Sequence, residues 1–311
     1  MRFPVVWSGV VRGATANPFE LGRIIGVLLL AGLMGGCSAI KVVYNQAPEL
    51  MYLYIDRYFD FNAEQKQEAK SELTRLQSWH RSTQLPLYIE TLKALQPKMM
   101  ADFSAAQACE TVTEVRAKLS AVATHVEPGA ARMALTFSDN QFEQMEKKFA
   151  RDNAKFRDDY IDAPLKKVHS KRMKDATERA EKLYGRLGER QLAVLGQIIS
   201  QSRFDAKTAY TERLRRQGAM LQTLRGLADP AQRAGAAAQQ RAVEAVHGLL
   251  QQPLVSADPA FRRYLETQTQ EACKGFADLH NVTTPEQRQH AVKTLRQYEE
   301  DFRLLAAQAP G

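Results

Sequence analysis

The sequence predicts an all-α fold, an elongated multi-helix bundle of long antiparallel helices after an N-terminal export signal. Past residue 47, apolar residues recur every three or four positions, which is the spacing of one helix face. No stretch shows the sustained alternation, rich in Val, Ile and Thr, that is typical of strands. Connections are short and no Gly/Ser linker appears, so we expect one helical domain over residues 47–308, with room for two lobes.

Prolines set the boundaries of the first predicted helices. Pro48 stands in the first turn of one helix, where its missing amide hydrogen costs nothing. The next helix starts at Ala63, and Pro86 should kink or restart it, because proline clashes with the preceding turn. A third helix should end near Pro128 and Gly129.

The predicted helices are longer in the middle of the chain. Apolar stripes indicate two long helices that are separated at Pro164, and then one long helix from Glu189 to Leu221. Three further helices should start at Pro230, Pro259 and Thr284.

The N-terminal segment is typical of an export signal. Residues 24–34 form an apolar run that is shorter than the ~20 residues of a membrane-spanning helix. Gly35, Gly36 and Cys37 follow at once and resemble the lipobox, in which the cysteine sulfur takes a diacylglyceryl group and becomes the mature N-terminus. We therefore expect a signal peptide over residues 1–36 and lipidation, with palmitate on the freed amine, at Cys37.

The residue after the cysteine indicates the membrane in which the lipoprotein is located. In Gram-negative lipoproteins, Asp directly after the cysteine retains the protein at the inner membrane. This chain has Ser38 at that position, and by resemblance to those sorting rules Ser38 favours the outer membrane. Several acyl chains together anchor a protein stably, whereas one chain does not. We expect a tether over residues 37–46 and a domain held on the periplasmic face of the outer membrane.

Charge argues against nucleic acid as a partner. Loss of the leader removes three basic residues and one acidic residue, which lowers the formal net charge from +8 to +6. Basic and acidic residues alternate throughout, as on solvated helix faces, and no aromatic residues are interleaved for base stacking.

Two cysteines remain in the mature chain besides Cys37. In an oxidising compartment Cys109 and Cys273 can form one disulfide, which closes a long loop and contributes about 4–5 kcal/mol in the chain-entropy model. As free thiols they would act as small apolar core residues. Both alternatives stay open.

Four helix starts share a Gln at the third helical position, which is the pattern of a capping box. They are Phe61-Asn62-Ala63-Glu64-Gln65, Phe137-Ser138-Asp139-Asn140-Gln141, Leu187-Gly188-Glu189-Arg190-Gln191 and Thr283-Thr284-Pro285-Glu286-Gln287. Capping explains the pattern by itself. An apolar residue followed by Thr-x-x-Gln also resembles the signature of small periplasmic stress chaperones, although Gly188 and Thr283 depart from it.

A second resemblance covers nearly the whole mature chain. Its segments are Val43-Tyr44-Asn45, Tyr54-Ile55-Asp56-Arg57-Tyr58-Phe59-Asp60, Trp79-His80-Arg81, Leu85-Pro86-Leu87-Tyr88 and Glu181-Lys182-Leu183-Tyr184-Gly185-Arg186-Leu187 with Gln191. The chain resembles an uncharacterised family of proteobacterial lipoproteins, a domain-of-unknown-function group. The resemblance implies a helical envelope protein and supplies no activity.

Three family-like residues are candidates for a site. Packing and helix-end hydrogen bonds are one explanation for Arg57, His80 and Arg81, since Arg beside a buried Trp is commonly structural. The functional alternative is a site for an anion or a peptide carboxylate.

A basic segment supplies the other candidates. Lys166, Lys167, Lys171 and Arg172 follow one another closely, and they favour either a solvated helix face or an anionic partner. In this compartment the anionic partner would be lipopolysaccharide, anionic phospholipid or peptidoglycan, and an envelope protein is a further candidate partner.

We expect no enzyme, no cofactor and no metal. The six histidines never form the i, i+4 pair of a metalloprotease, and no nucleophile elbow or phosphate-binding loop appears. The leading interpretation is a lipid-anchored binding or scaffold protein of the cell envelope. A periplasmic chaperone or stress sensor is the first alternative, and a peptidoglycan- or lipid-modifying enzyme is the second.

Overall fold

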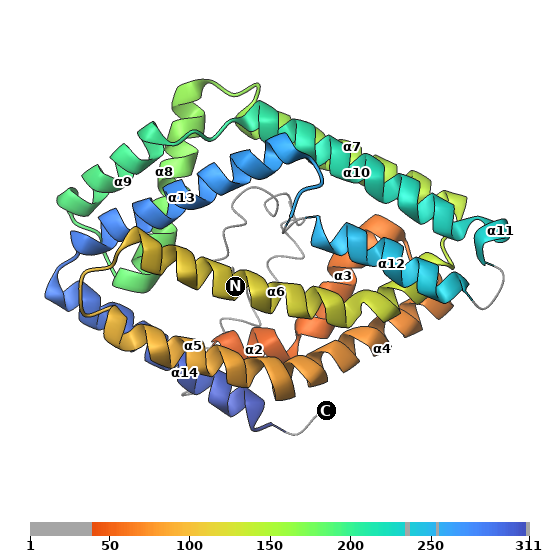
Figure 1. Ribbon diagram of the computed structural model, residues 1–311, viewed down its shortest axis with the longest axis horizontal. Helices are drawn as coiled ribbons and strands as arrows, with labels where there is room; N and C mark the ends of the chain where they lie inside the picture. Colours follow the sequence, from red (N-terminus) through yellow and green to blue (C-terminus); the bar gives the residue numbers. More distant parts are fainter. Residues whose placement is uncertain (1–38, 234–236, 253–254, 309–311) are drawn as a thin grey trace, which may run out of the picture.

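The computed structural model describes residues 39–233, 237–252 and 255–308, and every regular element in these ranges is helical (Figure 1). The helices are α2 (Ala39–Asn45), α3 (Ala47–Phe59), α4 (Ala63–Trp79), the π-helical turn η1 (His80–Gln84), α5 (Leu85–Lys98), α6 (Ala105–Ala134), α7 (Asp139–Tyr160), α8 (Leu165–Tyr184), α9 (Glu189–Gln201), α10 (Ala206–Ala228), α11 (Pro230–Arg233), α12 (Ala238–Gln251), α13 (Pro259–Asn281) and α14 (Pro285–Ala306). The predicted all-α bundle is confirmed. The predicted signal peptide and Cys37 lie outside the described residues.

The predicted tether is already part of the fold. Residues 39–45 form α2, which contacts α3 and α14. Within the described ranges, no helix has both the length and the apolar character needed to cross a bilayer.

Pro86 changes the helix type instead of ending the helix. The turn η1 lies between α4 and α5, and the amide of Leu85 donates to the carbonyl of His80, five residues back. A π-helical turn is wider than an α-helical one, so the chain passes the proline ring without a break.

The expected helix end near Pro128 and Gly129 is wrong. α6 runs through both residues to Ala134. A Cβ at Gly129 would lie 2.7 Å from the side chain of Glu72, so the glycine marks a close approach of α4 to α6. Packing against neighbouring helices thus keeps this segment helical, despite two residues that disfavour helix interiors.

The single helix expected from Glu189 to Leu221 is also wrong, because α9 ends at Gln201 and α10 begins at Ala206. Asp205 caps α10 by accepting hydrogen bonds from the amides of Lys207 and Thr208. This cap residue is a local signal that apolar periodicity overlooks.

Two hydrophobic cores lie at opposite ends of the molecule (Figure 1). The first is formed by α3, α4, α7, α10, α12 and the C-terminal half of α6. The second is formed by α5, α8, α9, α13, α14 and the N-terminal half of α6. The 30-residue α6, about 45 Å long, therefore belongs to both.

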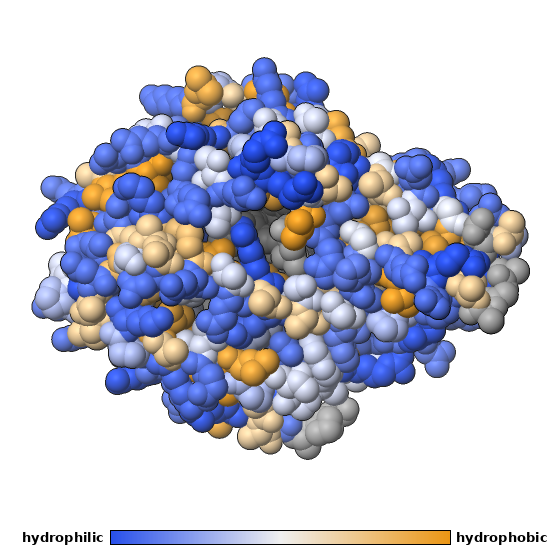
Figure 2. Space-filling view, viewed as in Figure 1, coloured by the Kyte–Doolittle hydropathy of each residue, from blue (hydrophilic) through white to orange (hydrophobic). Residues whose placement is uncertain are grey.

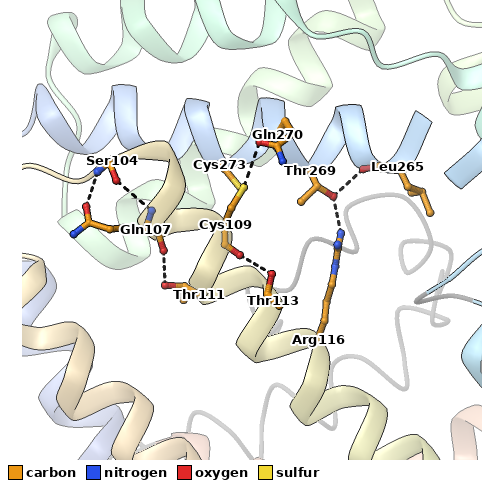
Figure 3. Close-up of a disulfide and its surroundings, with 10 residues drawn as sticks. All are labelled: Ser104, Gln107, Cys109, Thr111, Thr113, Arg116, Leu265, Thr269, Gln270 and Cys273. Carbon is orange, nitrogen blue, oxygen red and sulfur yellow. Dashed lines mark hydrogen bonds between the residues drawn. A yellow bond between two sulfur atoms is a disulfide. The ribbon is translucent and has the colours of Figure 1, made fainter. Parts of the chain in front are cut away.

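A disulfide between Cys109 and Cys273 joins α6 to α13 in the second core (Figure 3). The Cα atoms lie 5.3 Å apart, and Cys273 is buried. Close by, the guanidinium of Arg116 donates to the hydroxyl of Thr269 at 2.6 Å. Of the two alternatives for these cysteines, the structure therefore has the bonded one.

Candidate functional site

The family-like residues before Pro86 meet α2. The hydroxyl of Tyr44 lies 3.0 Å from Nδ1 of His80, and Arg81 donates to the side chain of Asn45 at 3.0 Å. The Arg81 guanidinium also lies over the Tyr44 ring, and the rings of His80 and Tyr88 meet edge to face. These contacts hold the first described helix against η1.

His80 is neutral in this junction. Burial lowers the pKa of His80 to about 4, because the charged imidazolium loses water contacts. Nδ1 of His80 and the hydroxyl of Tyr44 therefore share a hydrogen bond between neutral groups, and burial raises the pKa of Tyr44 to about 12 despite the nearby Arg81.

We expect this junction to weaken in mild acid. Because the folded-state pKa of His80 lies below that of the unfolded chain, its contribution is complete above about pH 6.5 and is lost as the pH falls toward 4. Between pH 6.5 and pH 4, the free energy of unfolding should therefore fall by roughly 2–3 kcal/mol less in the variant His80→Gln than in the parent. Urea unfolding at a series of pH values measures this. The exposed His169→Gln is the matched control, and an unchanged pH dependence in His80→Gln would contradict the assignment.

Arg57 does not join this junction. It lies exposed on α3, and its carbonyl accepts from the side chain of Gln144 on α7. Among the described residues, no contact links Arg57 to His80 or Arg81. The neighbouring Asp56 accepts from the amide of Phe61 at 3.0 Å and so stabilises the turn into α4.

The basic segment divides into exposed and engaged residues. Lys166 and Lys167 are exposed in the first turn of α8, which has no acidic residue. Lys171 pairs with Asp159 at 2.6 Å, and Arg172 lies over the Phe204 ring, where burial lowers its pKa. The part of this segment that can meet an anionic partner is therefore its first turn.

A buried carboxylate on α10 forms a second polar centre, which the sequence analysis missed. Glu212 is 4% exposed and accepts hydrogen bonds from Arg215, Arg216 and Ser256. Burial alone would raise the pKa of Glu212, but these hydrogen bonds outweigh it and lower the pKa to about 2. Arg215 and Arg216 thus bind the carboxylate of Glu212 within the protein.

The four glutamines of the helix starts meet in two pairs. Gln65 and Gln141 exchange hydrogen bonds at 3.3 and 2.7 Å in the first core, although 76 residues separate them. In the second core, Gln191 donates to Gln287 at 3.1 Å across 96 residues.

Each glutamine also donates to a carbonyl just before the partner motif, always two residues before the partner's cap residue. The acceptors are Thr136 for Gln65, Asp60 for Gln141, Val282 for Gln191 and Arg186 for Gln287. The two cores therefore share one local arrangement. Full capping boxes form at Asn62 and Thr284. At Ser138 and Gly188 the glutamine accepts from the cap amide, and at Ser138 it also accepts from the cap hydroxyl.

A fifth helix start provides an internal control. Ser104 and Gln107 form a full capping box at the start of α6, a match to the same sequence pattern that the sequence analysis overlooked. We expect Gln141→Ala to lower the free energy of unfolding by about 2–3 kcal/mol, because it also removes the hydrogen bonds that join buried Gln65 and the carbonyl of Asp60 to α7. Gln107→Ala should cost about 1 kcal/mol or less. Thermal unfolding of both variants measures the difference, and equal losses would mean that the pairing adds nothing.

Neither His80 nor Arg57 lines either of two surface hollows on the described part of the chain. One, of 390 Å³, lies between α10 and α12, and the other, of 260 Å³, lies between Met100 and α14. Within the described ranges, no cluster of three or more His, Cys, Asp or Glu side chains is arranged to hold a metal ion.

The fold and these centres define an all-helical protein in which polar side chains join helices from distant parts of the chain. Residues 57–240 match the model of DUF6279, a family of unknown function, so the chain belongs to that family. The predicted membership of an uncharacterised family is confirmed, and its lipoprotein character stays a prediction. No curated protein and no solved structure matches the chain.

Proposed function

We propose that this protein is a lipid-anchored, non-enzymatic binding or scaffold protein on the periplasmic face of the outer membrane. The observation that carries the proposal is the apolar run and the lipobox-like Gly35-Gly36-Cys37. The first described helix, α2, begins two residues after the cysteine. Lipidation at Cys37 would therefore place the helical domain directly on the membrane.

The use of the polar side chains supports a binding role over catalysis. A catalytic site could employ His80, Arg81 and Glu212, but His80 and Arg81 join η1 to α2, and Glu212 joins α10 to the segment before α13. The exposed lysines of α8, Lys166 and Lys167, remain the best candidates for an anionic envelope partner such as lipopolysaccharide phosphates or peptidoglycan carboxylates.

The test compares wild type, Cys37→Ala and Ser38→Asp in a Gram-negative host. Membrane fractionation and mass spectrometry of the N-terminal peptide should find a triacylated Cys37 in the outer membrane. Cys37→Ala should lose the lipid, and Ser38→Asp should keep it but move to the inner membrane. An unmodified wild-type chain with Met1 intact would refute the proposal.

A periplasmic chaperone is the second candidate, and exposed apolar side chains on α3 favour it. This function predicts that substoichiometric protein suppresses the aggregation of an unfolded client in a dilute light-scattering assay. Undiminished aggregation would exclude it.

A further inference from the structure

Helix α3 is apolar on two opposite faces. Its inner face, with Tyr52, Ile55 and Phe59, belongs to the first core. On the outer face Leu50 is 42%, Leu53 48% and Tyr54 45% exposed. A surface helix normally turns polar residues outward, so this second apolar face indicates a further contact.

The outer face is a continuous stripe. Leu50, Leu53, Tyr54 and Arg57 are spaced i, i+3, i+4 and i+7, so they lie along one side of the helix, and exposed Met51 lies at its edge. Among the described residues, no carboxylate forms an ion pair with Arg57. On the face drawn in Figure 2, by contrast, apolar side chains are scattered among hydrophilic ones.

The position of α3 in the chain identifies what covers the stripe. Only Ser38 separates Cys37 from α2, so a lipidated cysteine would hold the start of α2 within about 7 Å of its anchor point. The seven residues of α2 add about 10 Å, and α3 begins two residues later. The bilayer is therefore the apolar phase nearest to the stripe.

We propose that the outer face of α3 docks on the lipid surface, with Leu50, Leu53 and Tyr54 in the interfacial layer and Arg57 at the phosphates. The proposal rests on lipidation of Cys37 for its geometry. Leucines contribute apolar area, tyrosine favours the boundary between water and acyl chains, and arginine extends its charged end to the headgroups. The lipid anchor and α3 together would then fix the orientation of the domain.

The first experiment measures depth in the lipidated protein. Tyr54→Trp is reconstituted in vesicles of phosphatidylethanolamine and brominated phosphatidylglycerol, and the quenching of its fluorescence is compared with that of Leu165→Trp. Leu165 is 87% exposed at the start of α8, on the opposite edge of the molecule from α2 (Figure 1). Quenching at position 54 and not at 165 supports docking. Equal quenching at both positions, or none at position 54, overturns it even if Cys37 is lipidated.

The second experiment removes the anchor, so that the two proposals can fail separately. A chain with Cys37→Ala and without residues 1–36 is sedimented with vesicles of phosphatidylethanolamine and phosphatidylglycerol. Leu50→Ser/Leu53→Ser should bind at least about tenfold more weakly than this parent. The control Leu165→Ser/Leu214→Ser, which alters two exposed leucines elsewhere, should bind like the parent.

The other occupants of the stripe give different results. If a second copy covers it, the parent dimerises without lipid and Leu50→Ser/Leu53→Ser is monomeric in sedimentation equilibrium. If an unfolded client covers it, the double variant loses suppression of aggregation while vesicle binding is unchanged. Either result overturns membrane docking, and circular dichroism confirms that all variants keep the helical fold.

Discussion

Removal of the buried carboxylate on α10 should destabilise the protein strongly. We expect Glu212→Ala to lower the free energy of unfolding by about 3 kcal/mol, because the arginines and Ser256 lose their shared acceptor. The arginines are partly exposed, so water recovers some of the loss. Urea unfolding at neutral pH measures the effect.

The control is an acidic residue in a surface pair. Glu143→Ala breaks an exposed contact with Lys147 and should cost less than about 0.5 kcal/mol. The pH dependence adds a second check. Because the folded-state pKa of Glu212 is lowered, its contribution is present above about pH 4.5 and is lost as the pH falls toward 2. A Glu212→Ala chain as stable as the parent would contradict the assigned role.

Opening the disulfide should have the largest effect on stability. The bridge joins cysteines 164 residues apart, so the chain-entropy model predicts a loss of about 4–5 kcal/mol when it is removed. We expect Cys109→Ala/Cys273→Ala to unfold at a much lower urea concentration than the oxidised parent. Both chains carry Cys37→Ala, which prevents disulfides between molecules.

Reduction provides the matched comparison. The reduced parent should unfold near the midpoint of the double variant, since both lack the same constraint on the unfolded chain. Far-ultraviolet circular dichroism should be unchanged, because Arg116 and Thr269 still join α6 to α13. An identical midpoint for the oxidised and reduced parent would show that the bridge contributes nothing.

The helix starts show which hydrogen bonds can be predicted from local sequence. Gln65 and Gln141 were predicted to cap their own helices, because a capping box depends on residues three positions apart. The structure confirms that both glutamines accept from the cap amides. The cross-pairing could not be predicted, since the two glutamines are 76 positions apart and the chain between them must fold before their side chains meet.

The candidate site shows the same limit. The sequence singled out His80 and Arg81, but their partners Tyr44 and Asn45 lie 36 residues away and have no periodic relation to them. The sequence did not distinguish Glu212 from other charged residues, because one of its donors, Ser256, lies 44 residues away.

By itself, the sequence determined the all-α class and most helix starts, which depend on spacing and capping over a few residues. Tertiary structure alone decided that α6 continues through Pro128, because packing energy there exceeds a local preference. It also decided which apolar face of α3 is covered. Periodicity reveals that a face is apolar, whereas only the positions of α4 and α7 determine that Tyr52 is buried and Leu53 is not.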